Sequence, residues 1–293
     1  MINSKSLYGL LGYPLGHSFS RAFFNDKFSR EGIDAEYVNF ELPDVAALPE
    51  LIAAHPTLRG LNVTIPHKQA VIPFLDELSD EARAIGAVNV IRIGPSPRSP
   101  RGGESCISHG MDANGKEVPP PTGGVREGPH LTGFNSDVIG FRDSLRPLLQ
   151  AHHRRALVLG TGGASKAVCH ALDSLGIEWR YVSRNGGTSA VSGLGGFSAE
   201  KSPLPYSAIT PSLLTDYTLI INCTPLGMSP KIDTCPDIPY DALTPRHLLY
   251  DLVYNPEETL FLRRGREHGA TTKNGLEMLH LQALASWRFW NDL

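Results

Sequence analysis

The sequence predicts an α/β protein with two domains, and three observations indicate this fold class. The chain has 293 residues, enough for two domains that each bury a hydrophobic core of their own. Short apolar runs alternate with helical patterns along most of the chain, as in sheets covered by helices. A glycine-rich turn at residues 160–163 joins a strand pattern to a helix pattern, as in the first half of a βαβ unit.

The glycine-rich turn is the centre of the predicted second domain. A strand over residues 156–159 leads into the glycines, and a helix follows that ends at Gly176. Gly160 permits the tight turn, Gly162 lets a pyrophosphate approach the backbone, and the helix N-terminus favours phosphate. Because Ser165 stands where the usual motif has its third glycine, the turn alone is also compatible with an ordinary strand-to-helix connection. A second strand at the expected distance favours a Rossmann-type dinucleotide site.

The end of that second strand indicates which dinucleotide binds. The strand covers residues 177–182 and is followed by Ser183, Arg184 and Asn185. An NAD site normally has Asp or Glu here to bind the ribose 2′-OH, whereas an arginine suits a 2′-phosphate. The sequence therefore predicts NADP rather than NAD, with a solvent-facing Arg184 as the alternative interpretation.

Composition excludes several other classes of protein. The formal net charge of -3 gives no indication of a nucleic-acid partner. The four cysteines have no C-x-x-C metal spacing, so no metal site is expected, and Cys169 and Cys223 are interpreted as reduced core residues. No signal peptide and no apolar run of membrane-spanning length is recognised. A cytoplasmic protein that does not bind membranes is the expectation.

The first half of the chain is expected to form an α/β domain of its own. Strands are predicted at residues 7–12, 35–40, 61–65 and 86–91, and residues 131–137 bring the chain back after an insertion. Helices are predicted at residues 21–31, 45–54, 69–84 and 139–149. Residues 94–129 are dense in Gly, Pro, Ser and charge, which indicates an exposed insertion at a β-hairpin. We expect that shortening this insertion leaves turnover largely intact.

Polar side chains gather near the strand ends of this first half. Asn62 and Thr64 alternate with apolar residues, and Lys68 follows Pro66 just past the strand, where open α/β sheets bind ligands. The competing interpretations are a solvated Lys68 and a helix-capping role for Asp137. Ser18 and Ser20 are likewise candidates for helix caps.

The second half adds strands at residues 216–221 and 248–253 and a helix at residues 259–268. The turn at residues 222–228 can present backbone atoms to a flat ring such as nicotinamide. A last helix begins near Lys273, with Leu276, Leu279, Ala283 and Trp287 as its expected buried face. Gln282 lies within that apolar face and needs a partner, either core backbone or a substrate hydroxyl.

A series of short stretches in a fixed order carries a more specific signal. They are Gly12-Tyr-Pro-Leu-Gly-His-Ser-Phe-Ser20, Asn62-Val-Thr-Ile-Pro-His-Lys68, Gly86-Ala-Val-Asn89, Gly133-Phe-Asn-Ser-Asp137, Gly160-Thr-Gly-Gly-Ala164, Asn222-Cys-Thr-Pro-Leu-Gly-Met228, Tyr250-Asp-Leu-Val-Tyr254 and Asn274-Gly-Leu-Glu-Met-Leu-His-Leu-Gln-Ala283. Together they span nearly the whole chain and resemble the shikimate dehydrogenase family, including its quinate/shikimate members.

The resemblance implies a role for each matching residue. Lys68 corresponds to the catalytic lysine and Asp137 to its acidic partner, and both also bind substrate. The other implied substrate-binding residues are Ser18, Ser20, Thr64, Asn89, Tyr254 and Gln282. The implied cofactor-binding residues are Gly160, Thr161, Gly162, Gly163, Ala164, Ser183, Arg184, Leu252 and Gly275, of which Leu252 and Gly275 line the nicotinamide pocket.

The resemblance also implies the organisation and the reaction. Residues 1–137 would form the substrate-binding domain, joined by a C-terminal helix at residues 275–293, and residues 138–274 the NADP-binding domain. The expected reaction is the reversible NADP-dependent reduction of 3-dehydroshikimate to shikimate, in chorismate and aromatic amino acid biosynthesis, by a monomer or homodimer. A quinate/shikimate dehydrogenase that prefers NAD and a non-catalytic NADP-binding sensor are the alternatives; retention of Lys68 and Asp137 disfavours the sensor.

Some positions depart from the family pattern. Members commonly have Asn-Thr-Asp-Gly where this chain has Asn135, Ser136, Asp137 and Val138. After Arg184 the family usually continues to another basic residue, whereas this chain continues to two glycines. The segment at residues 94–129 is longer than usual for the family.

Overall fold

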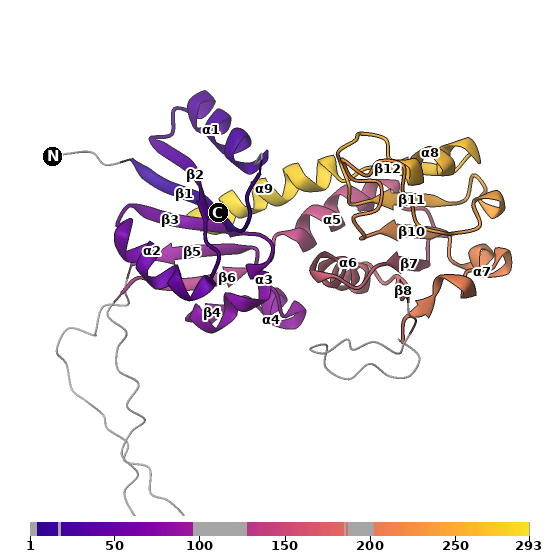
Figure 1. Cartoon of the computed structure of the whole chain (residues 1–293), viewed down its shortest axis with the longest axis horizontal. Helices are drawn as coiled ribbons and strands as arrows, with labels where there is room; N and C mark the ends of the chain where they lie inside the picture. Colours follow the sequence, from indigo (N-terminus) through magenta and orange to yellow (C-terminus); the bar gives the residue numbers. More distant parts are fainter. Residues whose placement is uncertain (1–4, 17–18, 96–127, 185, 187–201, 293) are drawn as a thin grey trace, which may run out of the picture.

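The computed structural model describes residues 5–16, 19–95, 128–184, 186 and 202–292, and these form two α/β lobes joined by long helices (Figure 1). Most of the insertion expected at residues 94–129 lies outside the described residues. The same holds for Ser18, for Cys106 and for most of the Gly/Ser-rich segment before Pro205.

The first lobe contains a mixed sheet of six strands in the order β2-β1-β3-β5-β6-β4. Strand β1 pairs in parallel with β2 and β3, whereas β5 runs antiparallel to both β3 and β6, as the predicted hairpin requires. The carboxyl ends of β1 and β3 therefore lie side by side at one edge. The strands are β1 Ser6–Gly12, β2 Ala35–Glu41, β3 Leu58–Val63, β4 Glu77–Leu78, β5 Val90–Gly94 and β6 His130–Phe134.

The second lobe contains a fully parallel sheet in the order β12-β11-β10-β7-β8-β9. This is the doubly wound order of a dinucleotide-binding domain, in which the connections reverse direction between β7 and β10. Ligands bind such sheets outside the carboxyl ends of these two strands. The strands are β7 Arg155–Leu159, β8 Glu178–Ser183, β9 Leu204–Pro205, β10 Leu219–Asn222, β11 Leu248–Asp251 and β12 Thr271–Lys273.

Helices cover both sheets, and the predicted α/β class is confirmed. The α-helices are α1 Phe19–Glu31, α2 Leu48–Ala54, α3 His67–Ala70, α4 Asp80–Ile85, α5 Asp137–Leu145, α6 Gly163–Ser174, α7 Pro211–Asp216, α8 Leu260–Glu267 and α9 Leu276–Asn291. Short 3-10 helices occupy Val45–Ala47, Ile72–Phe74, Arg146–Leu148, Tyr206–Ala208 and Tyr240–Ala242.

Helices α5 and α9 hold the lobes together. Helix α9 leaves the second lobe and returns to the first, where it packs on α5, β3 and β5 (Figure 1). Near its end the Trp290 indole N–H donates to the Ile91 carbonyl at 3.1 Å, and its ring occupies the space that a side chain at Gly60 would fill. Helix α5 places Val138 and Phe141 in the same core cluster as Val158 of the second sheet.

The region between residues 69 and 85 differs most from the sequence prediction. A single helix over residues 69–84 is wrong: α3 ends at Ala70, a 3-10 turn contains Pro73, and β4 pairs with β6 before α4 begins. Pro73 has no N–H to donate, and the Ser79 hydroxyl accepts from Ala82 N at 3.2 Å to start a new helix. Apolar spacing alone did not reveal either break.

Some boundaries and one buried face also differ. The strand expected from residue 86 begins at Val90, because Gly86 adopts φ +66° and ends α4. On α9, Leu276 is 38% exposed, whereas the buried residues include Met278, Gln282 and Ser286. The buried face of α9 is therefore partly polar, which a search for an apolar face cannot find.

Candidate active site

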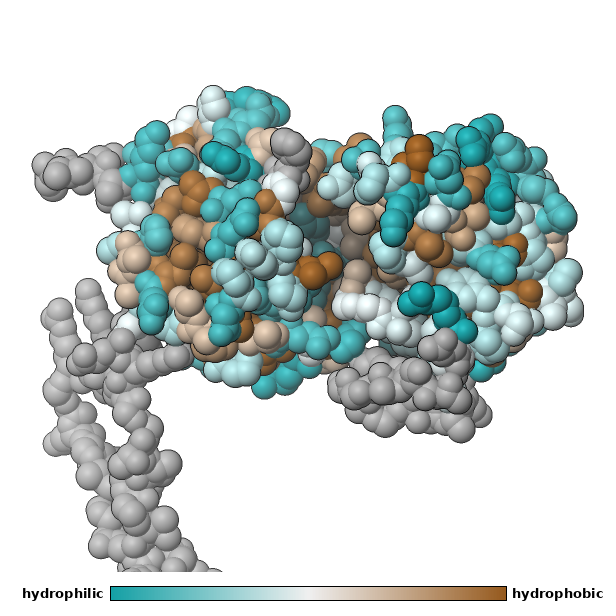
Figure 2. Space-filling view, in the orientation of Figure 1, coloured by the Kyte–Doolittle hydropathy of each residue, from teal (hydrophilic) through white to brown (hydrophobic). Residues whose placement is uncertain are grey.

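A cavity of about 420 Å³ lies between the lobes, at the carboxyl ends of β1 and β3. Figure 2 shows the hollow between the two lobes. The cavity gathers all the predicted substrate-binding residues that the structure describes, together with two residues expected near the nicotinamide. These are Ser20, Thr64, Lys68, Asn89, Asp137, Tyr254 and Gln282, with Leu252 and Gly275.

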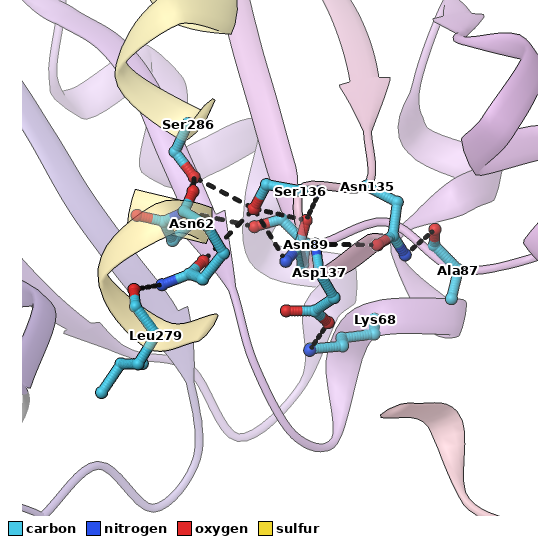
Figure 3. Close-up of polar contacts among 10 residues, drawn as sticks. Asn62, Lys68, Ala87, Asn89, Asn135, Ser136, Asp137, Leu279 and Ser286 are labelled. Atoms are coloured by element: carbon cyan, nitrogen blue, oxygen red, sulfur yellow. Dashed lines mark hydrogen bonds and ion pairs between the residues drawn. The ribbon is translucent and has the colours of Figure 1, made fainter. Parts of the chain in front are cut away.

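Lys68 reaches the cavity because the chain turns sharply after β3. Pro66 precedes the short helix α3, whose first residue, His67, is buried and donates through Nε2 to the Leu42 carbonyl at 2.6 Å. The Lys68 carbonyl accepts from Val88 N at 2.7 Å. With its backbone held on both sides, Lys68 extends its ammonium to Asp137 Oδ2 at 2.7 Å (Figure 3).

Asp137 is the first residue of α5, and the capping interpretation of this residue is wrong. The N-cap position is Ser136, and no side-chain cap hydrogen bond is made there. Asp137 N donates instead to Asn135 Oδ1 at 3.1 Å. The carboxylate thus lies at a helix N-terminus, where the helix dipole stabilises negative charge, and it is free to bind Lys68. The side chains of Lys68 and Asp137 are 22% and 13% exposed, and both line the cavity.

Two amide side chains in the cavity wall are oriented by Ser136 (Figure 3). Asn89 Oδ1 accepts from Ser136 N at 2.7 Å, and Asn89 Nδ2 donates to Ser136 Oγ at 3.1 Å. Gln282 Oε1 accepts from Ser136 Oγ at 3.2 Å, and Gln282 Nε2 donates to the Leu279 carbonyl at 3.0 Å. Because an amide has two N–H donors, these bonds leave one donor on each amide for a ligand. The partner that Gln282 needs is therefore supplied by both backbone and side chain.

The remaining predicted substrate residues come from both lobes. Ser20 lies in the first turn of α1, and Thr64 directly follows β3. Tyr254, which follows β11, is 40% exposed at the margin of the cavity. Residues from the two sheets thus face the same space, as expected for a site between domains.

A second cavity of about 420 Å³ lies outside the carboxyl ends of β7 and β10. Gly160 has φ +99°, and a Cβ there would lie 2.9 Å from Thr224 Cγ2. A Cβ on Gly162 or Gly163 would meet nothing within 4 Å, so the backbone above the start of α6 faces open space. The residues that line this second cavity are Gly160, Thr161, Gly162, Ser183, Arg184, Pro203, Tyr206, Cys223, Thr224, Pro225 and Leu226. Ala164, the next residue of the turn after Gly163, lines the first cavity, so the glycine turn joins the two spaces.

The described residues that line this second cavity include one cation, Arg184, and no carboxylate. Arg184 follows β8 and lies near Tyr206, a residue that the sequence analysis did not single out because it sits in an irregular segment. Burial raises the pKa of the Tyr206 hydroxyl to about 12, and the Arg184 cation counteracts that rise. Tyr206 therefore presents a neutral phenol beside Arg184.

A buried carboxylate organises the turn after β10. Asn222 Oδ1 accepts from the N–H and hydroxyl of Thr224 at 3.0 and 2.6 Å, and Asn222 Nδ2 donates to Asp251 Oδ1 at 3.0 Å. Asp251 also accepts from Val253 N at 3.0 Å and from the Thr259 hydroxyl at 2.6 Å. Burial raises the pKa of the Asp251 carboxyl to about 6, against the effect of these three donors. Asp251 thereby links the turn after β10, which lines the second cavity, to the backbone after β11, which lines the first cavity.

Leu252 and Gly275 are brought together at the base of the first cavity. Leu252 N donates to the Asn222 carbonyl at 3.0 Å, and a Cβ on Gly275 would overlap the Leu252 carbonyl. Only glycine permits this contact between the end of β11 and the start of α9.

Two negative findings concern the described residues alone. Within these ranges no helix is long and apolar enough to cross a membrane. Nor do three or more His, Cys, Asp or Glu side chains in the described part of the chain come together in a way that could hold a metal ion.

Comparison with known proteins identifies the family. The sequence model of the shikimate dehydrogenase substrate binding domain matches residues 10–91, which include Lys68. The shikimate dehydrogenase (NADP(+)) of Desulforamulus reducens is 34% identical over 298 residues, which covers 99% of this chain and 91% of that protein. The chain belongs to the shikimate dehydrogenase family. Another shikimate dehydrogenase (NADP(+)), from Syntrophomonas wolfei, is 37% identical over 280 residues, covering 93% of this chain and 84% of that protein.

Solved structures of shikimate dehydrogenases have the same fold. The chorismate mutase/shikimate 5-dehydrogenase fusion protein of Clostridium acetobutylicum has a TM-score of 0.74 and 34% identity, covering 99% of this chain and 92% of that chain. The shikimate 5-dehydrogenase of Thermus thermophilus, solved with NADP(H) and shikimate, has a TM-score of 0.73 and 28% identity, covering 98% and 94%. The likeness extends over both lobes.

Proposed function

We propose that this shikimate dehydrogenase family member catalyses the reversible NADP-dependent reduction of 3-dehydroshikimate to shikimate, a step toward chorismate and the aromatic amino acids. The observation that carries the proposal is the Lys68–Asp137 ion pair in a cavity that is continuous with the glycine turn of the second lobe. A lysine paired with a carboxylate beside a nucleotide site is suited to moving a proton while a hydride is transferred.

The second cavity fits NADP. Gly162 and Gly163 leave open space above the N–H groups that begin α6, which suits a pyrophosphate. Arg184 is placed to bind the 2′-phosphate, and no carboxylate among the described lining residues would repel it. Leu252 and Gly275 would lie against the nicotinamide, and NADPH, when bound, supplies the hydride that reduces the ketone.

The proton is assigned to Lys68. Negative charge grows on the substrate oxygen as the ketone is reduced, and a cation with a proton to donate lowers the barrier. Lys68 provides both at Nζ, while Asp137 orients the ammonium and stabilises its charge across 2.7 Å. In the reverse direction Lys68 accepts the hydroxyl proton, again with Asp137 as its partner.

The substrate carboxylate and hydroxyls are assigned to small, fixed polar groups of the first lobe. Asn89 and Gln282 each retain an amide N–H that no described residue uses, and Ser20 and Thr64 line the same cavity. Tyr254 closes the second-lobe side. We include Ser18 on the family resemblance, since it lies outside the described residues.

The division into domains is part of the same proposal. We assign residues 1–137 and 275–293 to the substrate-binding domain and residues 138–274 to the NADP-binding domain. Two observations support this division. The last strand of the first sheet ends at Phe134 and the first strand of the second sheet begins at Arg155, and α9 returns to pack on the first sheet. A cytoplasmic location and a monomeric or homodimeric state are proposed with it.

The test is an absorbance assay of the nicotinamide with shikimate or quinate as substrate and with NADP or NAD as cofactor. We expect the highest kcat/KM for the combination of shikimate and NADP. A higher value with quinate and NAD would support a quinate/shikimate dehydrogenase instead. Tight NADP binding in a binding titration, together with no turnover of either substrate, would support a non-catalytic sensor.

A further inference from the structure

A chain of buried hydrogen bonds runs behind the wall of the first cavity. The Tyr37 hydroxyl donates to Asn62 Oδ1 at 2.8 Å, and Asn62 Nδ2 donates to Ser286 Oγ at 2.9 Å. Ser286 Oγ lies 3.2 Å from Ser136 Oγ (Figure 3). Tyr37, Ser136 and Ser286 are fully buried, and Asn62 is 5% exposed. The chain thus connects β2, β3, α9 and the start of α5.

Both ends of this chain reach groups that face the cavity. At one end Ser136 contacts the amides of Asn89 and Gln282. At the other end burial raises the pKa of the Tyr37 hydroxyl, and the Ser20 side chain lies close enough to that hydroxyl to oppose this larger effect by lowering its pKa. Of the four members only Asn62 lines the cavity, so Tyr37, Ser136 and Ser286 act on it from behind.

The donors and acceptors of these hydrogen bonds can be assigned so that the bonds run without a break from Tyr37 to Gln282. The Tyr37 hydroxyl donates to Asn62 Oδ1, which turns the amide so that Nδ2 faces Ser286. Ser286 accepts that bond, and its single proton has two acceptors within reach, Ser136 Oγ at 3.2 Å and the Gln282 carbonyl at 2.9 Å; when it donates to Ser136, the hydrogen bonds run unbroken from Tyr37 to Ser136. Ser136 accepts from Asn89 Nδ2, so its single proton is available for Gln282 Oε1.

We propose that Tyr37 and Ser286 are positioning residues for the substrate, which act through Asn62 and Ser136 on the amides of Asn89 and Gln282. The inference rests on the proposed function, because it assumes that these amides hold the substrate. Neither residue contacts the substrate. Tyr37 and Ser286 hold the Asn62 amide, and Ser286 holds Ser136, which in turn removes the rotational freedom of the Asn89 and Gln282 amides. The remaining N–H of those two amides must point into the cavity, so the ordering cost is met before binding.

The competing explanation is that Tyr37 and Ser286 serve only the stability of the fold. Another part of the protein offers a matched control. In the second lobe the Ser144 and Tyr250 hydroxyls form a hydrogen bond of 2.7 Å. Both residues are as buried as Ser286 and Tyr37, but neither lines a cavity. Substitutions at Ser144 and Tyr250 remove buried serine and tyrosine hydroxyls of the same kind without affecting the amides of Asn89 and Gln282.

The experiment compares Tyr37→Phe and Ser286→Ala with Tyr250→Phe and Ser144→Ala in the full chain, well below the unfolding midpoint of each variant. We expect Tyr37→Phe and Ser286→Ala to raise KM for shikimate roughly 3- to 15-fold, the scale of one hydrogen bond, while KM for NADP and kcat stay near wild type. The control variants should leave KM for shikimate unchanged, even where they lower the unfolding midpoint.

An unchanged KM for shikimate in both test variants would overturn the inference, as would an equal rise in the control pair. If Ser286→Ala does not fold, Tyr37→Phe decides, because the phenylalanine ring keeps the stacking of Tyr37 on Phe24. If neither Tyr37→Phe nor Ser286→Ala folds while both control variants do, the buried hydrogen bonds serve stability alone, and the inference is overturned. Absence of shikimate turnover in the wild type would instead contradict the proposed function.

Discussion

Lys68 Nζ lies 2.7 Å from Asp137 Oδ2, although 69 residues separate the two in the sequence. Lys68 is presented by a short helix after β3, and Asp137 by the first turn of α5. Both stand in the wall of a cavity that also receives residues of the second lobe. The pair is therefore placed between the substrate-binding groups and the glycine turn.

Replacement of this lysine tests its assignment to proton transfer. Lys68→Ala should lower kcat by about 10²–10⁴-fold, the usual contribution of a general acid–base group. Affinity for NADP should change little, because Lys68 does not line the second cavity. Steady-state kinetics and a separate NADP titration measure the two effects.

The matched control is Lys27→Ala, which removes a lysine that pairs with Glu31 one turn further along α1. Its kcat should stay near wild type. Near-normal kcat in Lys68→Ala would remove Lys68 from the proton-transfer step, whatever happens to substrate affinity.

Arg184 is expected to select NADP over NAD. A guanidinium binds a phosphate through paired hydrogen bonds, so Arg184→Ala should weaken NADP by about 1.5–3 kcal/mol and leave NAD almost unchanged. The measurement is kcat/KM for both cofactors at fixed shikimate and ionic strength. Arg155→Ala is the control, since Arg155 begins β7 at the opposite end of the sheet and pairs with Glu178 and Asp216.

Equal losses for NADP and NAD in Arg184→Ala would indicate that Arg184 serves the adenine or the fold instead. A wild-type preference for NAD would contradict the cofactor assignment altogether.

Two glycines should respond differently to alanine because only one has room for a side chain. A Cβ on Gly162 meets nothing within 4 Å but enters the space proposed for the pyrophosphate, so Gly162→Ala should weaken NADP with little loss of stability. A Cβ on Gly275 would overlap the Leu252 carbonyl, so Gly275→Ala should lower the unfolding midpoint as well as activity. Thermal unfolding without ligand and an NADP titration separate the outcomes; a strongly destabilised Gly162→Ala would contradict the open space above α6.

Asp251 should make stability depend on pH in a defined direction. Because burial raises its folded-state pKa from 3.8 to about 6, the folded protein keeps a proton that the unfolded chain has released between these values. This carboxyl therefore favours folding at low pH, and that contribution is lost as pH rises toward and beyond 6. The unfolding free energy of wild type minus that of Asp251→Asn should fall by up to about 3 kcal/mol over this range.

Denaturant unfolding of both proteins between about pH 4.5 and about pH 7.5 provides the measurement, and other titrating groups cancel in the difference. A difference that does not change with pH, or that grows in favour of wild type as pH rises, would show that Asp251 ionises as readily in the folded protein as in the unfolded chain.

The sequence was sufficient to predict the strand, the glycine turn and the helix at residues 156–176. The strand at residues 156–159, the glycines and the following helix predicted a phosphate-binding turn, and the structure has β7, the positive φ of Gly160 and α6 there. Such a turn depends on backbone geometry that neighbouring residues alone impose. Apolar spacing failed between residues 69 and 84, because the pairing of β4 with β6 depends on residues distant in the chain.

By itself the sequence determined the α/β class, the glycine turn, the arginine after β8 and the family resemblance that points to Lys68 and Asp137. Only the tertiary structure decided what each side chain contacts: that Asp137 binds Lys68 instead of capping α5, and that Tyr37 and Ser286 stand behind the amides of the cavity wall. The physical reason is that a hydrogen bond requires its two atoms to lie within about 3 Å. For residues far apart in the chain, that distance is set by how the sheets and α9 pack, which no local pattern encodes.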